Sequence, residues 1–254
     1  MVRVGCMERL LEGKTIFITG AGRGIGAAAA RLFVAEGAQV MLAARSEEQL
    51  AGVAAETGAS YVVCDLADPD AIRTAVERTV TQYGRLDGAF NNGARGQPPG
   101  PMDELSVDVM DELYAVNLRG LWVAMVAEVT AFRAGGGGGS IVNTSSIGGL
   151  MPNPALPGYG AVKRAGHSLT ASAAATYGPE NIRVNAIAPG TTLTEMLRDW
   201  DRATPGVIDG LNAQTPLRRA AQPDEIAQAA AWLLSDRSSY VTGTVLPVDG
   251  GLAA

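Results

Sequence analysis

The sequence is poor in several residue types, and each shortage narrows what the protein can do. Only two of its 254 residues are cysteines, Cys6 and Cys64, and they stand in unrelated contexts without metal-ligand spacing. This usage favours reduced thiols in a cytoplasmic protein. The single histidine, His167, has no evident nucleophile or metal ligand to pair with. We therefore expect neither a metal site nor disulfide bonds.

Charge and hydropathy argue against two classes of partner. Acidic residues outnumber basic ones by 26 to 20, and no basic stripe offers a surface for nucleic acid. No apolar run approaches the ~20 residues that span a bilayer, and no signal-peptide pattern opens the chain, so no membrane is expected. Residues 1–12 carry no pattern, and Met7 resembles an alternative start, so we expect a flexible extension there. The hydrophobic content of 47% indicates a globular domain over residues 13–254.

Strand-like and helix-like segments alternate along the chain, which predicts an α/β fold. Alternation of this kind gives a parallel sheet with helices on both faces, and right-handed crossovers make it doubly wound and Rossmann-like. A variable segment interrupts the pattern at about 191–219 and is expected to cover the substrate. The seven expected strands are 14–19, 38–44, 60–64, 86–91, 140–144, 182–188 and 244–248. An Ala-rich helix is expected after the glycine turn, to about residue 36, and the other main helices are expected at 47–56, 69–83, 106–132, 159–177 and 223–235.

Tyr159 and Lys163 stand four residues apart, thirteen residues after Ser146. Positions four apart lie on one face of a helix, so both side chains can reach the same place. A tyrosine hydroxyl titrates near pH ~10, and a neighbouring ammonium favours the phenolate and lowers that pKa. The pair therefore suggests an acid–base group.

A glycine-rich turn, Thr19-Gly-Ala-Gly-Arg-Gly-Ile-Gly26, separates the first expected strand from the first helix. Gly20, Gly24 and Gly26 allow a tight turn and a close approach of the backbone to a pyrophosphate. The free N–H groups at the helix N-terminus would face that anion. This placement predicts a dinucleotide site.

The glycine spacing, with three residues and then one between glycines, resembles the short-chain dehydrogenase/reductase family. Further landmarks of its compact single-domain branch follow in order along almost the whole chain. They are Asp65, Asn91-Asn-Gly-Ala94, Asn117, Ile141-Val-Asn-Thr-Ser-Ser146, Tyr159 with Lys163, Arg183-Val-Asn-Ala-Ile-Ala-Pro-Gly190 and Val248-Asp-Gly-Gly251.

The end of the second strand predicts which nicotinamide cofactor is used. An NAD enzyme places a carboxylate there for the ribose 2′-hydroxyl, whereas this chain has Ala44, followed by Arg45 and Ser46. Arg45, and Arg23 in the glycine turn, suit a 2′-phosphate. The alternative is that both arginines are solvated surface charges. We expect NADP(H).

The resemblance implies roles for four residues. Tyr159 would exchange a proton with the substrate oxygen, Lys163 would lower the tyrosine pKa and hold the nicotinamide ribose, and Ser146 would stabilise charge on that oxygen. Asn117 would anchor a water that links Lys163 to solvent. Ser145 is the neighbouring candidate, but the family's interval to the tyrosine favours Ser146.

The resemblance also implies a set of cofactor contacts. Thr192 stands where the family usually has Ile or Val, and Asn92-Gly93-Ala94 departs from the commoner Ala-Gly order, so those contacts are open to change. The expected cofactor residues are Gly20, Arg23, Gly24, Ile25, Gly26, Arg45, Ser46, Asp65, Leu66, Asn91, Gly93, Tyr159, Lys163, Pro189, Gly190, Thr192 and Thr194.

Apolar residues in two segments, 147–158 and 191–219, suggest a largely hydrophobic substrate. An equally weighted alternative is that they only pack the lid or an oligomer contact. The candidate substrate residues are Ser146, Met151, Leu156, Leu193, Leu197 and Trp200.

These features lead to one expected activity and two alternatives. We expect NADPH-dependent reduction of a small carbonyl compound to a secondary alcohol. The alternatives are a 3-oxoacyl-thioester (acyl-carrier-protein) reductase and a regulator that senses NADP(H) without turnover. The resemblance further implies a homotetramer, or a homodimer.

Overall fold

The computed structural model describes residues 9–254. Seven parallel strands form one sheet in the order β3-β2-β1-β4-β5-β6-β7. The strands are β1 (Thr15–Thr19), β2 (Gln39–Ala44), β3 (Ser60–Val63), β4 (Gly88–Asn91), β5 (Gly139–Thr144), β6 (Ile182–Pro189) and β7 (Val245–Val248). The predicted doubly wound, seven-stranded parallel sheet is therefore confirmed, with strand ends shifted by only one or two residues.

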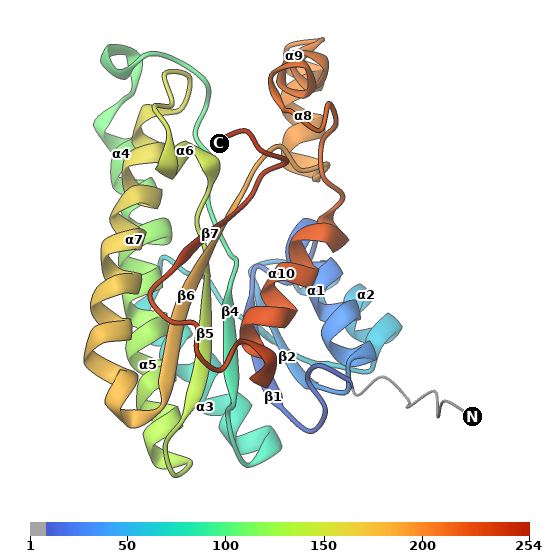
Figure 1. The fold of residues 1–254 in the computed structure, drawn as a ribbon, viewed down its shortest axis with the longest axis vertical. Helices are drawn as coiled ribbons and strands as arrows, with labels where there is room; N and C mark the ends of the chain where they lie inside the picture. The colour runs from blue at the N-terminus through green and yellow to red at the C-terminus, as the bar shows by residue number, and fades with distance from the viewer. Residues whose placement is uncertain (1–8) are drawn as a thin grey trace.

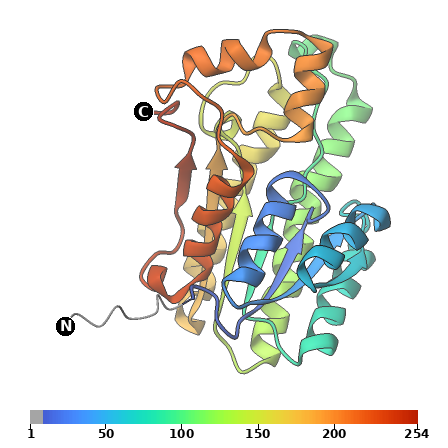
Figure 2. The same ribbon diagram turned by 90° about the vertical axis from the view of Figure 1, so that its right-hand side faces the viewer.

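Helices cover both faces of the sheet, as Figure 1 shows. One face carries α1 (Gly24–Ala35), α2 (Glu47–Thr57) and α10 (Pro223–Leu234), and Figure 2 shows α1 and α10 side by side over the sheet. The other face carries α3 (Pro69–Tyr83), α5 (Gly120–Ala134) and α7 (Pro157–Tyr177). Each face encloses its own apolar cluster, with Phe33 and Phe90 in one and Phe17 and Phe132 in the other.

Residues 9–12, which the sequence placed in a flexible extension, are attached to the domain. Leu11 is fully buried in the core, and the N–H group of Leu10 donates to a carboxylate oxygen of Glu36 at 2.7 Å. Burying a leucine stabilises the fold by roughly 2 kcal/mol, which holds this short segment on the domain. The expectation is therefore wrong for residues 9–12, and the rest of the extension, with Met7 and Cys6, lies outside the described residues.

The expected long helix at 106–132 contains an irregular turn. α4 (Val107–Tyr114) continues through one π turn, Ala115–Arg119, into α5. By length and composition alone, the helix spanning Val107–Ala134 could cross a membrane, so the expectation that no segment is long and apolar enough is wrong. Core helices of globular proteins share this length and composition, and this helix packs against α3, α7 and the sheet.

The remaining helices lie above the carboxyl ends of the strands. They are α6 (Ile147–Leu150), α8 (Glu195–Ala203) and α9 (Val207–Gln214). Short 3₁₀ turns at Met102–Glu104, Gly178–Glu180 and Asp236–Ser238 complete the chain. The variable segment at 191–219 thus consists mainly of two helices, α8 and α9.

Candidate active site

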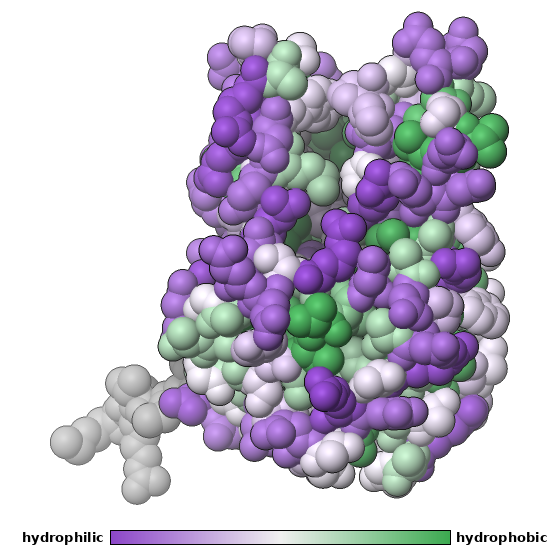
Figure 3. Space-filling view, turned by 180° about the vertical axis from the view of Figure 1, so that it is seen from behind, coloured by the Kyte–Doolittle hydropathy of each residue, from purple (hydrophilic) through white to green (hydrophobic). Residues whose placement is uncertain are grey.

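The candidate site lies at the carboxyl ends of the strands. The chain runs from β1 outward to β3 and then returns to β4 on the other side of β1, so β1 and β4 meet at the point where the winding reverses. Ligands of open α/β sheets bind in the crevice at this point. Figure 3 shows a hollow between two upper lobes of the molecule, one formed around α8 and α9 and the other around α4 and α6, with apolar residues inside it.

The glycine turn is packed so closely that side chains would not fit. A Cβ on Gly26 would lie 2.1 Å from the Gly20 carbonyl oxygen, and one on Gly20 would lie 2.5 Å from Cα of Gly93. Gly20 and Gly24 also have positive φ angles, +66° and +55°, which disfavour other residues. The half-buried Ile25 follows Gly24 in the first turn of α1. Four of the predicted cofactor residues thus form one backbone-built corner.

This corner fits the pyrophosphate of a nicotinamide dinucleotide. α1 begins at Gly24, and its N-cap residue Arg23 makes no side-chain capping hydrogen bond. The first N–H groups of the helix therefore retain their capacity to bind an anion, and the helix dipole favours negative charge there. A Cβ on Gly24 would touch Thr194 at 3.2 Å, so Thr194 stands directly over the turn.

The residues predicted for the adenosine end lie around the ends of β2 and β3. Arg23 and Arg45 are exposed, and within residues 9–254 neither forms an ion pair with a carboxylate. The Ser46 hydroxyl caps α2 by accepting from the N–H of Gln49 at 3.4 Å. Asp65 is exposed and accepts from the N–H of Ala67, and Leu66 is half-buried.

Asn91 is buried at the end of β4, where it lines a small cavity. Its side-chain amide donates to Glu128 at 3.0 Å and to Asn143 at 3.1 Å. Neighbouring Gly93 donates its N–H to the Thr19 hydroxyl at 3.1 Å, which joins the end of β4 to the glycine turn. Asn91 therefore supports the floor of the crevice.

The side chains expected to carry the chemistry meet at the other side of the crevice. Tyr159 lies in the first turn of α7 and hydrogen-bonds with Ser146, which follows β5 and caps α6. Lys163 is buried one turn later, with Nζ 5.6 Å from the centre of the Tyr159 ring. Its ammonium group donates to the Thr144 carbonyl oxygen at 2.7 Å. One helix and one strand end thus hold all three groups.

Burial sets the protonation of this pair. It raises the pKa of Tyr159 to about 12, against the lowering effect of the Ser146 hydrogen bond, and it lowers the pKa of Lys163 to about 8. The sequence predicted that Lys163 would lower the tyrosine pKa; that contribution stays a prediction, and the net shift of the Tyr159 pKa is upward. The reason is that the phenolate would lose solvation in the buried site, and the ammonium is directed at Thr144. At neutral pH the tyrosine is therefore a proton donor.

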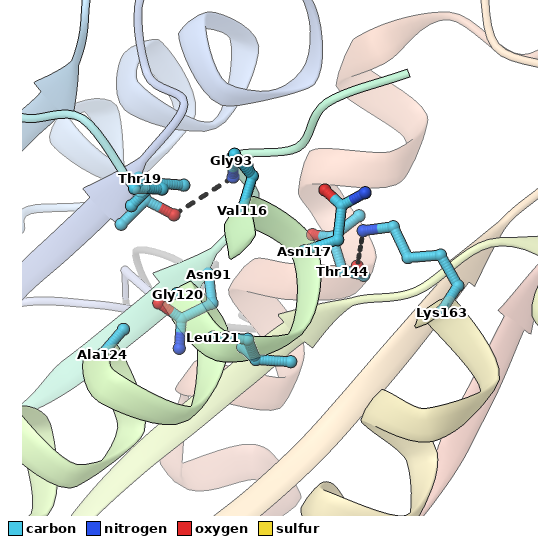
Figure 4. Close-up of a pocket in the computed structure, with 11 residues that line it drawn as sticks. Thr19, Asn91, Gly93, Val116, Asn117, Gly120, Leu121, Ala124, Thr144 and Lys163 are labelled. Atoms are coloured by element: carbon cyan, nitrogen blue, oxygen red, sulfur yellow. Dashed lines mark hydrogen bonds between the residues drawn. The ribbon is translucent and has the colours of Figure 1, made fainter. Parts of the chain in front are cut away.

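Asn117 lies in the π turn and lines a small cavity with Lys163 and Thr144 (Figure 4). Its side-chain oxygen accepts from the Arg95 N–H and its amide donates to the Arg95 carbonyl, both at 2.9 Å. Both side-chain groups are thus bound to the main chain of Arg95, so the side chain anchors the loop after β4. That Asn117 also anchors a water linking Lys163 to solvent, as the resemblance implies, stays a prediction.

The segment after β6 closes the crevice. Pro189 ends the strand, and a Cβ on Gly190 would lie 2.7 Å from Cα of Asp249. Thr192 is buried, and its hydroxyl donates to the Gly190 carbonyl at 3.1 Å. The Thr192 hydroxyl is thus hydrogen-bonded within its own turn. Thr194 is the residue of this segment that contacts the glycine turn.

The six candidate substrate residues have different surroundings. Ser146 faces Tyr159, and Met151 is exposed on the wall that follows α6. Leu156, Leu193 and Trp200 are half-buried, and Leu197 is buried inside α8. The structure therefore makes Leu197 part of the packing of the lid.

Three functional-site contacts were not predicted from the sequence. Ser145, which precedes Ser146, is hydrogen-bonded to His167, although no nucleophile was expected to pair with that histidine. The Gln97 side chain accepts from the N–H of Tyr159 at 2.8 Å and so caps α7. The third is the burial of Glu128 beneath Asn91. In the sequence, the only mark of Gln97 is that two prolines follow it, which is a weak indication of a functional contact. Glu128 is a glutamate within an apolar helix, which is a somewhat stronger indication.

Cysteine and metal chemistry have little support in the described part of the chain. Burial raises the pKa of Cys64 to about 11, so the thiol is protonated at neutral pH. Among residues 9–254, no group of three or more His, Cys, Asp or Glu side chains is arranged to hold a metal ion.

Comparison with known proteins agrees with this geometry. A sequence model of a family described as enoyl-(acyl carrier protein) reductase matches residues 20–253. The chain is 48% identical over 250 residues to an A-factor type gamma-butyrolactone 1′-reductase (1S-forming) of Streptomyces virginiae, which covers 96% of this chain and 97% of that protein. It is 42% identical over 246 residues to a 2,5-dichloro-2,5-cyclohexadiene-1,4-diol dehydrogenase of Sphingobium indicum, covering 96% and 98% of the two chains.

A solved structure of levodione reductase has the same fold. It matches with a TM-score of 0.91 at 33% identity and covers 96% of this chain and 98% of its own. The relatives are oxidoreductases that act on secondary alcohols or ketones, and the family uses a nicotinamide cofactor. The chain belongs to the short-chain dehydrogenase/reductase family.

Proposed function

We propose that this protein reduces a ketone on or beside an aliphatic ring to a secondary alcohol, with NADPH as the hydride donor. The observation that carries the proposal is the meeting of Ser146, Tyr159 and Lys163 at one edge of the crevice, opposite the glycine turn. When bound, the cofactor would supply a hydride to the carbonyl carbon. The protein would then have to supply a proton and stabilise the charge on the substrate oxygen.

Tyr159 supplies the proton in this proposal. With a pKa of about 12 it is protonated at neutral pH, so it can give a proton to an alkoxide as the alkoxide forms. The reverse reaction needs the deprotonated tyrosine as a base, which burial disfavours. Reduction near pH 7 therefore starts from the protonated tyrosine.

Ser146 and Lys163 assist the transfer. The Ser146 hydroxyl lies beside the tyrosine and can donate to the same substrate oxygen, which stabilises its growing negative charge. The Lys163 ammonium, fixed by the Thr144 carbonyl, places positive charge 5.6 Å from the tyrosine ring. This charge stabilises the phenolate that is left after proton transfer.

The choice of NADPH rests on the end of β2. Ala44 stands at the last position of that strand, where no carboxylate would repel a 2′-phosphate, and Arg23 and Arg45 are exposed nearby without carboxylate partners among residues 9–254. The substrate class rests on the exposed Met151 and the half-buried Trp200, together with the ring compounds named for two relatives.

The acyl-carrier alternative is favoured by the description of the matching family, whereas three arginines around the cleft are already paired with carboxylates. An acidic carrier needs unpaired basic residues. Arg95 pairs with Glu112, Arg202 with Asp199 and Arg219 with Glu225. We therefore rank free ketones above carrier-bound substrates.

We also propose a cytoplasmic homotetramer, or a homodimer. Trp122 and Val126 on α5 are exposed, as are Tyr114 on α4 and Tyr240 before β7, and exposed apolar residues of this kind suit contacts between subunits. Light scattering at several concentrations would measure the assembly.

A spectrophotometric screen tests the proposed activity. The purified protein would be mixed with NADPH or NADH and a panel of cyclic ketones, linear ketones and a 3-oxoacyl carrier protein, and cofactor oxidation would be followed. The proposal predicts turnover of cyclic ketones with NADPH preferred. Turnover of the carrier substrate alone would favour the thioester reductase, and cofactor binding without any turnover would favour a sensing role.

A further inference from the structure

We propose that His167 is a positioning residue for the reaction, because its ring holds Ser145 and thereby fixes the neighbouring Ser146 against Tyr159. This inference rests on the proposed function, since it assigns a role in the same site. It concerns a residue that touches neither of the expected reactants.

The contact between Ser145 and His167 joins a buried hydroxyl to a half-buried ring. Ser145 Oγ lies 2.5 Å from Nε2 of His167, and Ser145 is only 6% exposed. Within residues 9–254 this is the hydrogen bond of the Ser145 hydroxyl, so loss of the ring would leave a buried hydroxyl unpaired. An unpaired buried hydroxyl costs about 1–3 kcal/mol, which gives the turn a reason to shift when the ring is removed.

The two serines bind the same helix at different points. Ser146 has an extended backbone, with φ −164° and ψ 156°, and side chains of successive extended residues point to opposite sides. Ser145 accordingly reaches His167, whereas Ser146 reaches Tyr159. The two helix positions are eight residues, about 12 Å, apart along α7. Two such attachments fix both the position and the rotation of the turn after β5.

α6 lies directly over the pair and shares the attachment. A Cβ on Gly149 would lie 3.1 Å from Ser145 Oγ and 3.2 Å from His167 Nε2. The Arg164 guanidinium donates to the Gly149 and Leu150 carbonyls, both at 3.3 Å. Movement of the Ser145 side chain would therefore disturb the helix that begins at Ser146.

The ring is neutral at neutral pH. Burial, then Arg164 and Lys163, lower the pKa of His167. Both charged groups belong to α7, and the groups that face the ring from the β5 end and from α6 are the Ser145 hydroxyl and the Gly149 backbone, which carry no charge. When the neutral ring carries its proton on Nδ1, Nε2 accepts a hydrogen bond from the Ser145 hydroxyl, which suits a fixed attachment.

A double-mutant cycle tests the role. Steady-state reduction by wild type, His167→Leu, Ser145→Ala and the double variant would be compared, with cofactor affinity measured separately by fluorescence. We expect each single variant to lower kcat about tenfold, because small misplacements of a catalytic group are costly. We also expect cofactor affinity to stay within about twofold and the double variant to be no slower than either single one.

Two further variants sharpen the result. His167→Gln can still hydrogen-bond to Ser145 and should recover most of the lost kcat, and Ser168→Ala, at an exposed neighbouring position of α7, should match wild type. An additive double variant, no recovery by His167→Gln, or a Ser145→Ala variant with wild-type kcat would overturn the positioning role. Ser145→Ala decides the matter even if His167→Leu does not fold. Absence of turnover in wild type would instead count against the proposed function.

Discussion

The two sides of the crevice are built in different ways. On the side of β1 and α1, the site is made of backbone: Gly20 and Gly26 pack where no Cβ fits, and the free N–H groups of a helix face the crevice. On the side of β5 and α7, the site is made of side chains: Ser146, Tyr159 and Lys163 meet through hydrogen bonds and charge. Changes on the first side should act through shape and affinity, and changes on the second through proton transfer.

Tyr159→Phe should have the largest effect and test the side-chain half alone. The variant keeps the ring and loses the hydroxyl, so kcat should fall by about 10²–10⁴, the usual contribution of a general acid. NADPH affinity, measured by fluorescence titration, should change by less than about twofold, because the glycine corner is untouched. Retention of wild-type kcat would remove the tyrosine from the mechanism.

Gly26→Ala should disrupt the side of the crevice that is built from backbone. The added methyl group would lie 2.1 Å from the Gly20 carbonyl oxygen, so the turn must open. Overpacking of this kind costs about 1–3 kcal/mol, and cofactor affinity should fall at least as steeply as stability.

Gly52→Ala is the matched control for that variant. Gly52 lies in α2 with nothing within 4 Å of its Cβ position, so the change should stabilise the helix by about 1 kcal/mol. Chemical denaturation and NADPH titration of both variants would make the comparison. Equal behaviour of the two would show that the close packing at Gly26 is unimportant.

Ala44→Asp should shift cofactor preference from NADPH toward NADH without altering either side of the crevice. A carboxylate at the end of β2 would repel a 2′-phosphate and accept from a 2′-hydroxyl, so the ratio of kcat/KM for NADPH to that for NADH should fall about tenfold or more. Ala44→Asn is the uncharged control. A preference for NADH in the wild type would contradict the proposed cofactor.

Glu128→Gln should have the smallest effect on turnover and on cofactor affinity, and its effect on stability should depend on pH. Burial raises the pKa of Glu128 from its usual value near 4.5 to about 8. Between these values the folded protein holds a proton that the unfolded chain has lost, so the free energy of unfolding falls as pH rises, by about 1.4 kcal/mol per unit.

The glutamine variant removes this term and should lose that slope between about pH 4.5 and 8. Denaturation at pH 5, 6, 7 and 8 would measure it, with Glu56→Gln, at an exposed position, as control. Parallel slopes for wild type and Glu128→Gln would show that the carboxyl group is charged in the folded state.

The sequence predicted what depends on local pattern. Alternating segments indicated the seven parallel strands, and the spacing of Gly20, Gly24 and Gly26 indicated the turn that packs against Gly93. The spacing of Tyr159 and Lys163 placed them one helical turn apart. These predictions depend on periodicities of the chain itself.

What the sequence did not predict depends on surroundings. The direction of the Tyr159 pKa follows from desolvation, which no spacing reveals. The pairing of Ser145 with His167 joins residues 22 positions apart, and that of Asn117 with the Arg95 main chain also joins positions 22 apart. The burial of Leu11 depends on an apolar cluster assembled by the rest of the domain.

The π turn at Ala115–Arg119 has a consequence for protein engineering. It holds one residue more than a regular turn, so α4 and α5 present faces that are out of phase by about 100°. Deleting a single residue there would restore a regular helix and swing Asn117 away from the Arg95 main chain, while Gly120 and the inward face of α5 kept their place. The deletion variant would therefore have a more regular helix but would hold the loop after β4 less well.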